Sequence, residues 1–173
     1  MPLTSTVIPT PLGDMLAVAS EQGLCLLEFL GQNGVERELA QVEAARGGPV
    51  QEGSNAVLEQ ARQQLGEYFA GERQEFSIPL DLVGTPFQLK TWQALLAIPF
   101  GETRSYSQQA HHIGQPTATR AVAGANGCNK VSIVVPCHRV IGSNGSLTGF
   151  GGGLPRKQAL LELEGRVAAP ILI

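Results

Sequence analysis

The stretch IVVPCHRVI, residues 133–141, decides how the rest of the chain is interpreted. Two runs of β-branched residues flank a proline, a thiol, an imidazole and a guanidinium. Apolar runs of this kind are usually buried, and a buried cysteine is usually inert. A thiol reacts as its thiolate, however, and a neighbouring histidine or positive charge favours that form. Local chemistry therefore leaves open whether Cys137 is a core residue or a nucleophile.

Length and composition suit a folded protein with one large domain or two small ones. The chain has 173 residues, of which 43% are hydrophobic, so it can bury a sizeable core. Its three cysteines cannot all pair, and its first residues lack the basic and apolar regions of a secretory signal peptide. No apolar run approaches the ~20 residues of a membrane span. We therefore expect free thiols, a cytoplasmic location and no membrane contact.

The charges are distributed unevenly between the two halves. The net charge is -3, but residues 1–82 carry -8 and residues 83–173 carry +5. This asymmetry permits a basic, phosphate-facing second half beside an acidic first half. Two ordinary solvated surfaces would give the same counts, and the charges alone do not separate these alternatives.

The first half reads as a small antiparallel sheet with helices. Apolar alternation and turn residues predict strands over residues 3–8, 15–19, 24–29 and 76–80. Helices are expected over residues 35–45 and from Ser54 or Asn55 to Phe69. A boundary near residue 82 predicts two domains, 1–82 and 83–173.

The second half contains two capping boxes, which mark the beginnings of helices. Thr85 and Ser105 are each followed three residues later by a glutamine. The second box opens a short helix that is expected to end near Gly114, and another helix is predicted over residues 117–126. Two short helices joined by a tight turn are typical of a helix-turn-helix. An Asn-Gly pair at residues 144–145 predicts a hairpin, which would make the arrangement winged.

The helix over residues 117–126 consists almost entirely of small residues and carries one arginine, Arg120. A helix that only fills a core would carry leucine or isoleucine. A small-residue face lets the backbone approach a large flat partner, and a duplex groove fits. Tight packing against neighbouring helices explains the pattern equally well.

The second half also carries a series of motifs in unbroken order. They are GTPFQ (84–88), WQAL (92–95), IPFGETRSY (98–106), RAV (120–122), ANG (125–127), PCHRVIG (136–142) and LTGFGGGL (147–154). Together they resemble the O6-alkylguanine-DNA alkyltransferases, most closely the bacterial single-polypeptide type. The first half resembles this family only in size and in its sheet-plus-helix character.

The resemblance implies an α/β (α+β) fold. The N-terminal domain would be ribonuclease-H-like, with a three-stranded antiparallel sheet and helices, and the C-terminal domain a mostly helical winged helix-turn-helix. The implied activity is direct-reversal DNA repair, in which O6-alkylguanine is flipped out of duplex DNA bound through the minor groove. The alkyl group would move irreversibly to Cys137, and O4-alkylthymine is a further candidate substrate. A monomer is expected, and cooperative assembly on DNA stays open.

The resemblance also implies roles for individual residues. Cys137 would be the acceptor, His138 the base that activates it through a bound water, and Glu164 the supporting carboxylate. Tyr106 resembles the phenol that donates a proton to the departing guanine. Asn129 resembles a hinge asparagine whose amide bonds to the backbone.

Further positions are implied in DNA binding and in the base pocket. Arg120 would fill the hole left by the flipped base, although contact with phosphates is the alternative. The rest of the DNA-binding set comprises Thr117, Ala121, Ala125, Asn126 and Gly127. The pocket set comprises Arg139, Val140, Phe150, Gly151 and Lys157.

Two residues depart from the family pattern. Lys130 stands where a proline usually follows the hinge asparagine, and Phe150 stands where tyrosine is usual. The zinc site of some members is not expected, because the first half has one cysteine and no histidine. His111 and His112 diverge if they lie on a helix, so we expect neither a metal nor a cofactor.

Two other functions remain as alternatives. A lesion-binding sensor would resemble this chain but lack the acceptor thiol. A cysteine hydrolase would need an oxyanion hole and would turn over repeatedly. Counting the alkyl groups removed by each protein molecule separates the three functions.

Overall fold

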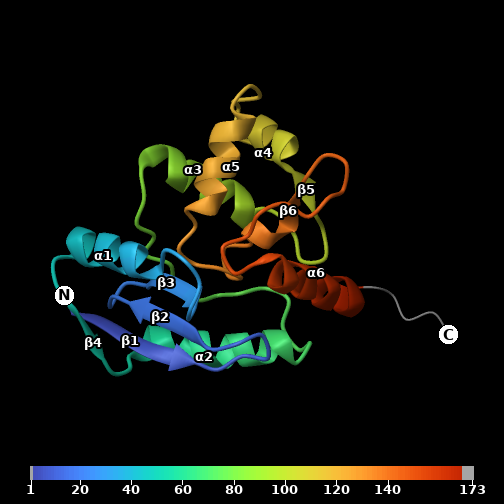
Figure 1. Ribbon diagram of the computed structural model, residues 1–173. Coiled ribbons are helices and arrows are strands. Elements are labelled where there is room, and N and C mark those ends of the chain that lie inside the picture. The colour runs from blue at the N-terminus through green and yellow to red at the C-terminus, as the bar shows by residue number, and fades with distance from the viewer. Residues whose placement is uncertain (1, 169–173) are drawn as a thin grey trace. The chain divides into compact units, whose positions relative to one another are not determined.

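A mixed four-stranded sheet forms the centre of the first half of the chain (Figure 1). The structure, a computed structural model, describes residues 2–168. The strands are β1 (Leu3–Ile8), β2 (Met15–Ala19), β3 (Leu24–Phe29) and β4 (Val50–Glu52), in the spatial order β3-β2-β1-β4. β2 pairs antiparallel with both β1 and β3, whereas β4 pairs parallel with β1.

The sheet differs from the three-stranded antiparallel sheet that the resemblance implies and from the further strand that the sequence predicts over residues 76–80. The fourth strand, β4, has only three residues, which is too short to show an alternating pattern. The strand predicted over residues 76–80 is wrong, because this segment forms only an isolated bridge between Leu80 and Leu24. Pro79 lies in that segment and has no backbone N–H to donate to a ladder.

The helices α1 (Val35–Arg46) and α2 (Ala56–Phe69) cover opposite faces of this sheet (Figure 1). Val42 of α1 packs in a buried cluster with Val18 and Leu26. On the other face, Arg62 of α2 donates to the hydroxyl of Thr6. The predicted helix beginning is confirmed at α2, where the side chain of Asn55 accepts from Leu58 N.

Lys130–Ser132 belongs to the same compact unit as the chain up to Val83. Leu27 of β3 holds this segment with two backbone bonds, from its N–H to Lys130 O (2.8 Å) and from Ser132 N to its carbonyl (2.9 Å). The ammonium of Lys130 is buried and donates to Val83 O at 3.0 Å. The lysine that departs from the family pattern is therefore part of the core of this unit.

The second compact unit contains Gly84–Asn129 and, within the described chain, residues 133–168. Its elements are α3 (Pro86–Leu96), β5 (Arg104–Ser105), α4 (Tyr106–His112), α5 (Thr119–Gly127), the 3-10 helix η1 (Cys137–Arg139), β6 (Val140–Ile141) and α6 (Leu154–Ala168). Both predicted capping boxes are confirmed, at the beginnings of α3 and α4. Buried residues of α3, α4 and α5 form one cluster that includes Ala94, Ala110 and Val122.

The beginning of α5 and the strand pairing beside residues 144–145 differ from what the sequence predicts. α5 begins at Thr119 instead of residue 117, because the preceding residues form a turn closed by a bond from Ala118 N to Gln115 O. The predicted turn at Asn144-Gly145 forms, since Gly142 N bonds to Ser146 O and Gly145 has a φ of 82°. β6, however, pairs in parallel with β5 and not with the segment after this turn.

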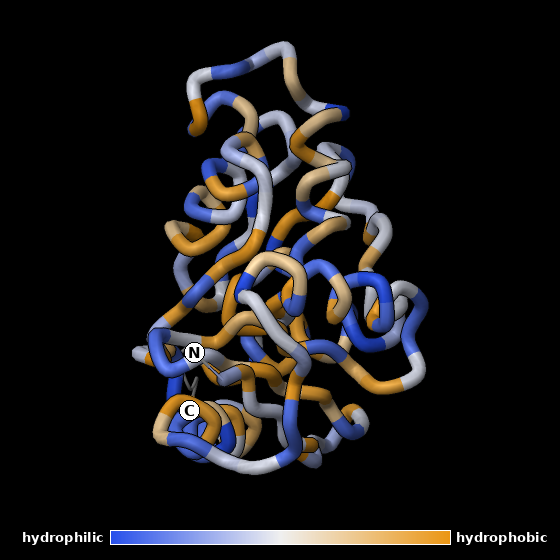
Figure 2. Tube along the Cα trace, turned by 90° about the vertical axis from the view of Figure 1, so that its left-hand side faces the viewer, coloured by the Kyte–Doolittle hydropathy of each residue, from blue (hydrophilic) through white to orange (hydrophobic). Residues whose placement is uncertain are grey.

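Hydrophobic segments along the chain are short and are interrupted by hydrophilic residues (Figure 2). Among residues 2–168, no helix is long and apolar enough to cross a membrane.

Candidate active site

Cys137 begins the single turn η1, which lies between two buried runs of the chain. Val135, His138 and Val140 are fully buried, whereas the thiol residue is half-buried. The backbone N–H of Cys137 donates to Val135 O at 2.8 Å, which fixes the turn. Cys25, by contrast, is fully buried in β3. The buried flanks therefore hold Cys137 in place while its side chain stays accessible.

The side chain of Asn129 reaches the thiol. Its Nδ2 atom donates to Val135 O at 2.9 Å and to Cys137 Sγ at 3.2 Å. A donor that bonds to the charged form of a group favours that form. The amide of Asn129 therefore both fixes the backbone before Cys137 and places a hydrogen-bond donor at its sulfur.

His138 and Glu164 form a buried pair between η1 and α6. Nε2 of the imidazole lies 2.7 Å from Oε2 of the carboxylate, and the two side chains are 0% and 1% exposed. A carboxylate can only accept, so we assign the ring proton to Nε2. Among residues 2–168, nothing hydrogen-bonds to the buried Nδ1. Nδ1 is therefore the nitrogen with a lone pair that can take up a proton.

Arg139 neutralises the charge of the same carboxylate. Its guanidinium donates to both oxygens of Glu164, from Nε at 2.8 Å and from Nη2 at 3.1 Å. Its Nη1 donates to Ile98 O at 2.8 Å, and the group lies over the ring of Phe100. Such a bidentate pair fixes the carboxylate in one orientation. The structure thus places Arg139, which the resemblance assigns to the pocket set, against the carboxylate of Glu164.

Burial and charge pairing set the protonation of this cluster. Burial lowers the pKa of His138 below its usual 6.5, and the neighbouring Glu164 only partly opposes this effect. Burial by itself would raise the pKa of Glu164, but the bonds and charges of His138 and Arg139 lower it to about 2. At neutral pH the cluster therefore holds a neutral imidazole against an ionised carboxylate.

These two pKa shifts should make the protein less stable in acid. The unfolded chain binds a proton at His138 more readily than the native state does, so stability should fall as the pH drops below about 6.5. Glu164 should contribute stability above about pH 4.5, and this contribution should disappear as the pH approaches about 2. Urea midpoints measured along a pH series test this expectation. The control is H111Q/H112Q, which changes two exposed histidines and should keep the wild-type profile. A midpoint that does not change from neutral pH to about pH 5 would contradict the protonation states assigned here.

A cavity of about 500 Å³ lies beside the thiol. Its walls come from α4, α5, η1 and the loop before α6, and its lining residues are Tyr106, Ala123, Asn126, Gly127, Cys137, Thr148, Gly149, Phe150 and Gly151. Phe150 and Gly151 of the expected pocket set thus line it, whereas Arg139, Val140 and Lys157 do not. Lys157 lies behind the wall, where its Nζ donates to Val140 O at 2.7 Å and to Thr148 O at 2.9 Å. Burial lowers the pKa of Lys157, and the charge of Cys137 opposes this shift.

α5 presents an exposed face of small residues with one arginine. Arg120, Ala121, Ala123, Gly124 and Gly127 are exposed, and so is Thr117, which precedes the helix. Ala125 and Asn126, also in the expected DNA-binding set, are buried. Asn126 exchanges two hydrogen bonds with Gln109 of α4, at 2.9 and 2.7 Å. The exposed face can therefore meet a partner, while the buried residues fix the helix in its unit.

Two features of the site were missed in the sequence. A guanidinium inside a buried run needs a counter-charge. The sequence therefore predicts a carboxylate partner for Arg139 but does not show which carboxylate it is. In the sequence, Thr148 stands out only as a member of the glycine-rich motif at residues 147–154. Its hydroxyl lies 2.6 Å from the hydroxyl of Tyr106, and no local pattern marks that contact.

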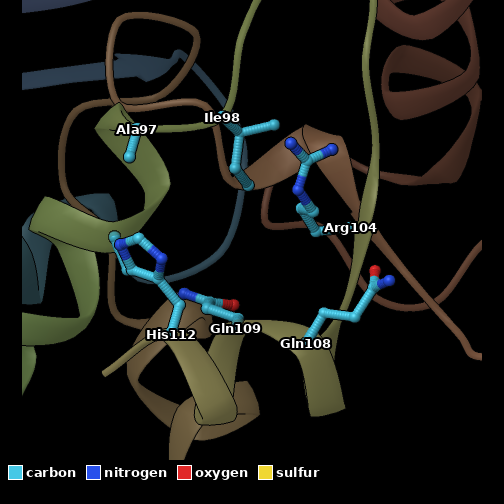
Figure 3. A pocket seen from close by; sticks show the side chains of 7 residues that line it. Ala97, Ile98, Arg104, Gln108, Gln109 and His112 are labelled. Carbon is cyan, nitrogen blue, oxygen red and sulfur yellow. The ribbon is translucent and has the colours of Figure 1, made fainter. Parts of the chain in front are cut away.

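A second, smaller cavity of about 220 Å³ lies in the same unit (Figure 3). Figure 3 shows Gln109 and His112 of α4 on one side of it and Arg104 of β5 on another. Its remaining lining residues are Ala94, Ala97, Ile98 and Gln108. It has no thiol in its walls, so the cavity beside Cys137 is the candidate reaction pocket.

Fold and site together define a two-domain protein in which the second domain carries an accessible cysteine beside a buried histidine–glutamate pair. Residues 3–82 match the family description "6-O-methylguanine DNA methyltransferase, ribonuclease-like domain". Residues 86–166 match "6-O-methylguanine DNA methyltransferase, DNA binding domain". The chain therefore belongs to the 6-O-methylguanine DNA methyltransferase family, which transfers a methyl group from O6-methylguanine in DNA to a cysteine of the protein.

Individual relatives agree with this assignment. The constitutive methylated-DNA–protein-cysteine methyltransferase of Bacillus subtilis is 47% identical over 156 residues, which cover 90% of this chain and 91% of that protein. The Mycobacterium tuberculosis protein of the same name is 63% identical over 101 residues, but this stretch covers only 58% of this chain and 61% of the relative. A crystal structure of Mycobacterium tuberculosis OGT in complex with DNA matches with a TM-score of 0.80 and 44% identity, covering 97% of this chain and 95% of that one.

Proposed function

We propose that this chain repairs DNA by moving the alkyl group of O6-alkylguanine to the sulfur of Cys137, irreversibly and once per molecule. The observation that carries the proposal is the half-buried thiol in the wall of a cavity of about 500 Å³, next in sequence to a histidine that a carboxylate holds. O4-alkylthymine is a second candidate substrate. We expect the protein to be a monomer in a reducing cytoplasm, where Cys137 stays a thiol. Cooperative assembly on DNA stays open.

The arrangement supports a thiolate mechanism. The proton of Cys137 would pass to Nδ1 of His138, directly or through one water, and the carboxylate of Glu164 would stabilise the imidazolium that forms. The thiolate would attack the alkyl carbon, and the carbon–oxygen bond to the guanine would break. Tyr106, whose side chain lines the same cavity, would give a proton to the departing base. The products would be a thioether on the protein and an unmodified guanine in the DNA.

Residues 83–173 would carry DNA binding as well as the acceptor. A related protein has been crystallised with DNA, and the net charge of this half is +5. The exposed face of α5 carries no side chain larger than alanine except that of Arg120, so its backbone can approach the floor of a minor groove. A base stacked inside a duplex cannot enter a cavity, so the lesion would be flipped out before reaction.

Arg120 should assist this flipping from the exposed face of α5. Unstacking a base costs a few kcal/mol, so Arg120→Ala should slow transfer from duplex DNA by about tenfold or more. Transfer from the free base O6-methylguanine should keep its rate, because that substrate needs no flipping. Arg166→Ala, which removes an exposed arginine from α6, is the matched control and should behave like the wild type. An equal loss of rate on both substrates would show that Arg120 acts on the fold or the chemistry instead.

A titration of methylated duplex against a fixed amount of protein tests the proposed function. We expect methyl removal to stop at about one methyl group per chain, because the acceptor is consumed. Continued removal would indicate a hydrolase. Tight binding to the lesion without any removal would indicate a sensor. Either outcome would overturn the proposal.

A further inference from the structure

The hydroxyl groups of Tyr106 and Thr148, two residues that line the cavity beside Cys137, form a hydrogen bond with each other. The two oxygens are 2.6 Å apart, and the residues are 42 positions apart in the sequence. Tyr106 is the first residue of α4, and Thr148 lies in the loop before α6. Both side chains are partly buried, and both line the cavity.

A buried lysine fixes the position of Thr148. Glycines follow it at 149, 151, 152 and 153, so the loop itself imposes little order. The ammonium of Lys157, which is 0% exposed, donates to Thr148 O at 2.9 Å and to Val140 O at 2.7 Å. These bonds tie the loop to β6 at the residue that meets the tyrosine. The Tyr106–Thr148 contact is therefore built into the fold of this unit.

The relative acidity of the two hydroxyls gives the contact a direction. Either hydroxyl can donate in this contact, and we assign the donation to Tyr106 because a phenol is a stronger acid than an aliphatic alcohol. The hydroxyl hydrogen of threonine rotates to suit its surroundings. If Tyr106 loses its proton, Thr148 can turn its own O–H toward the phenolate. A hydrogen bond to an ionised oxygen is roughly twice as strong as a neutral one.

We propose that Thr148 is a positioning residue for proton transfer from Tyr106 to the departing guanine, an inference that rests on the proposed function. In this step the bond from Cys137 sulfur to the alkyl carbon forms and the carbon–oxygen bond breaks, with its electron pair passing to the guanine. The guanine takes the proton of Tyr106, and the O–H of Thr148 bonds to the phenolate. The phenolate regains a proton from solvent, and the imidazolium of His138 releases to solvent the proton that it took from the thiol, so the protein ends with no net gain or loss of a proton.

The test compares Thr148→Val, which keeps the shape of the side chain but not its hydroxyl, with Thr148→Ser, which keeps the hydroxyl. Single-turnover transfer should slow by about 10- to 100-fold in Thr148→Val, the size expected for a lost hydrogen bond to a charged group. Thr148→Ser should retain most of the rate. The affinity for unmodified duplex should be the same in both variants. Ser143→Ala, which removes an exposed hydroxyl from the same loop, is the control and should react like the wild type.

A double-mutant cycle separates this role from simple support of the loop. If Thr148 acts through the phenol, Thr148→Val should cause no further loss in a Tyr106→Phe background. A full additional loss in that background, a wild-type rate in Thr148→Val, or a Thr148→Ser variant as slow as Thr148→Val would each overturn the inference. Failure of the proposed function would appear separately, as wild-type protein that does not accept a methyl group.

Discussion

Cys137→Ala should abolish methyl transfer while leaving DNA binding intact. The alanine has no atom that can form a bond to the alkyl carbon, and none of the other side chains lining the cavity is a thiol. The variant should fold, because the bond from Asn129 to Val135 O does not involve the thiol. Transfer of a labelled methyl group should therefore fall below detection. Binding of a fluorescent duplex should keep its wild-type affinity.

Cys128→Ala is the matched control for this experiment. Cys128 is also a free cysteine, and it is exposed at the end of α5. Its replacement should leave both the rate of transfer and the final stoichiometry unchanged. Methyl removal by Cys137→Ala, or its loss in Cys128→Ala, would show that the acceptor has been assigned to the wrong residue.

Of the substitutions proposed here, Glu164→Gln should lower the free energy of unfolding the most. The glutamine cannot balance the charge of Arg139, which would then be buried without its partner carboxylate. Removing one member of a buried ion pair costs about 3–5 kcal/mol. The denaturant midpoint should fall accordingly. The rate of transfer should also fall, since the carboxylate no longer stabilises a protonated His138.

Glu162→Gln tests whether the loss comes from the ion pair or from α6 in general. Glu162 is exposed on the same helix and accepts a hydrogen bond from Gln158. Its replacement should change the free energy of unfolding by less than about 0.5 kcal/mol. A wild-type midpoint for Glu164→Gln, or equal losses in the two variants, would contradict the role given to the buried cluster.

The elements that could be predicted from sequence are those whose causes are local. Strands β1, β2 and β3 have the predicted bounds, because apolar alternation and adjacent turns determine them. The capping boxes at Thr85 and Ser105 each lie within four consecutive residues, so their bonds could also be predicted. The beginning of α5 was placed too early, because the turn at Pro116 competes with the first turn of the helix.

Pairings between distant segments could not be predicted in this way. β4 joins β1, and β6 joins β5, through short strands that have no pattern of their own. The resemblance named Cys137, His138 and Glu164 as members of one site. It did not give the bidentate contact of Arg139 with Glu164 or the bond between Tyr106 and Thr148, which depend on how the loop and α6 pack.

The proposed transfer requires a thiol that is accessible yet surrounded by fixed groups. Asn129 bonds to the sulfur, and the neutral imidazole of His138 offers a lone pair at Nδ1. The carboxylate of Glu164, which holds this imidazole, is buried and paired with the guanidinium of Arg139. Neither charge is therefore available to bind the substrate. Each group can then act on one proton or one bond during a single transfer.

The mass of the peptide that contains Cys137, measured after the protein has reacted with O6-methylguanine duplex, tests the central claim most directly. The account predicts that this peptide gains one methyl group in place of one hydrogen, that the other cysteine peptides keep their masses, and that an equal amount of guanine is restored. Restored guanine together with an unmodified Cys137 peptide would contradict it.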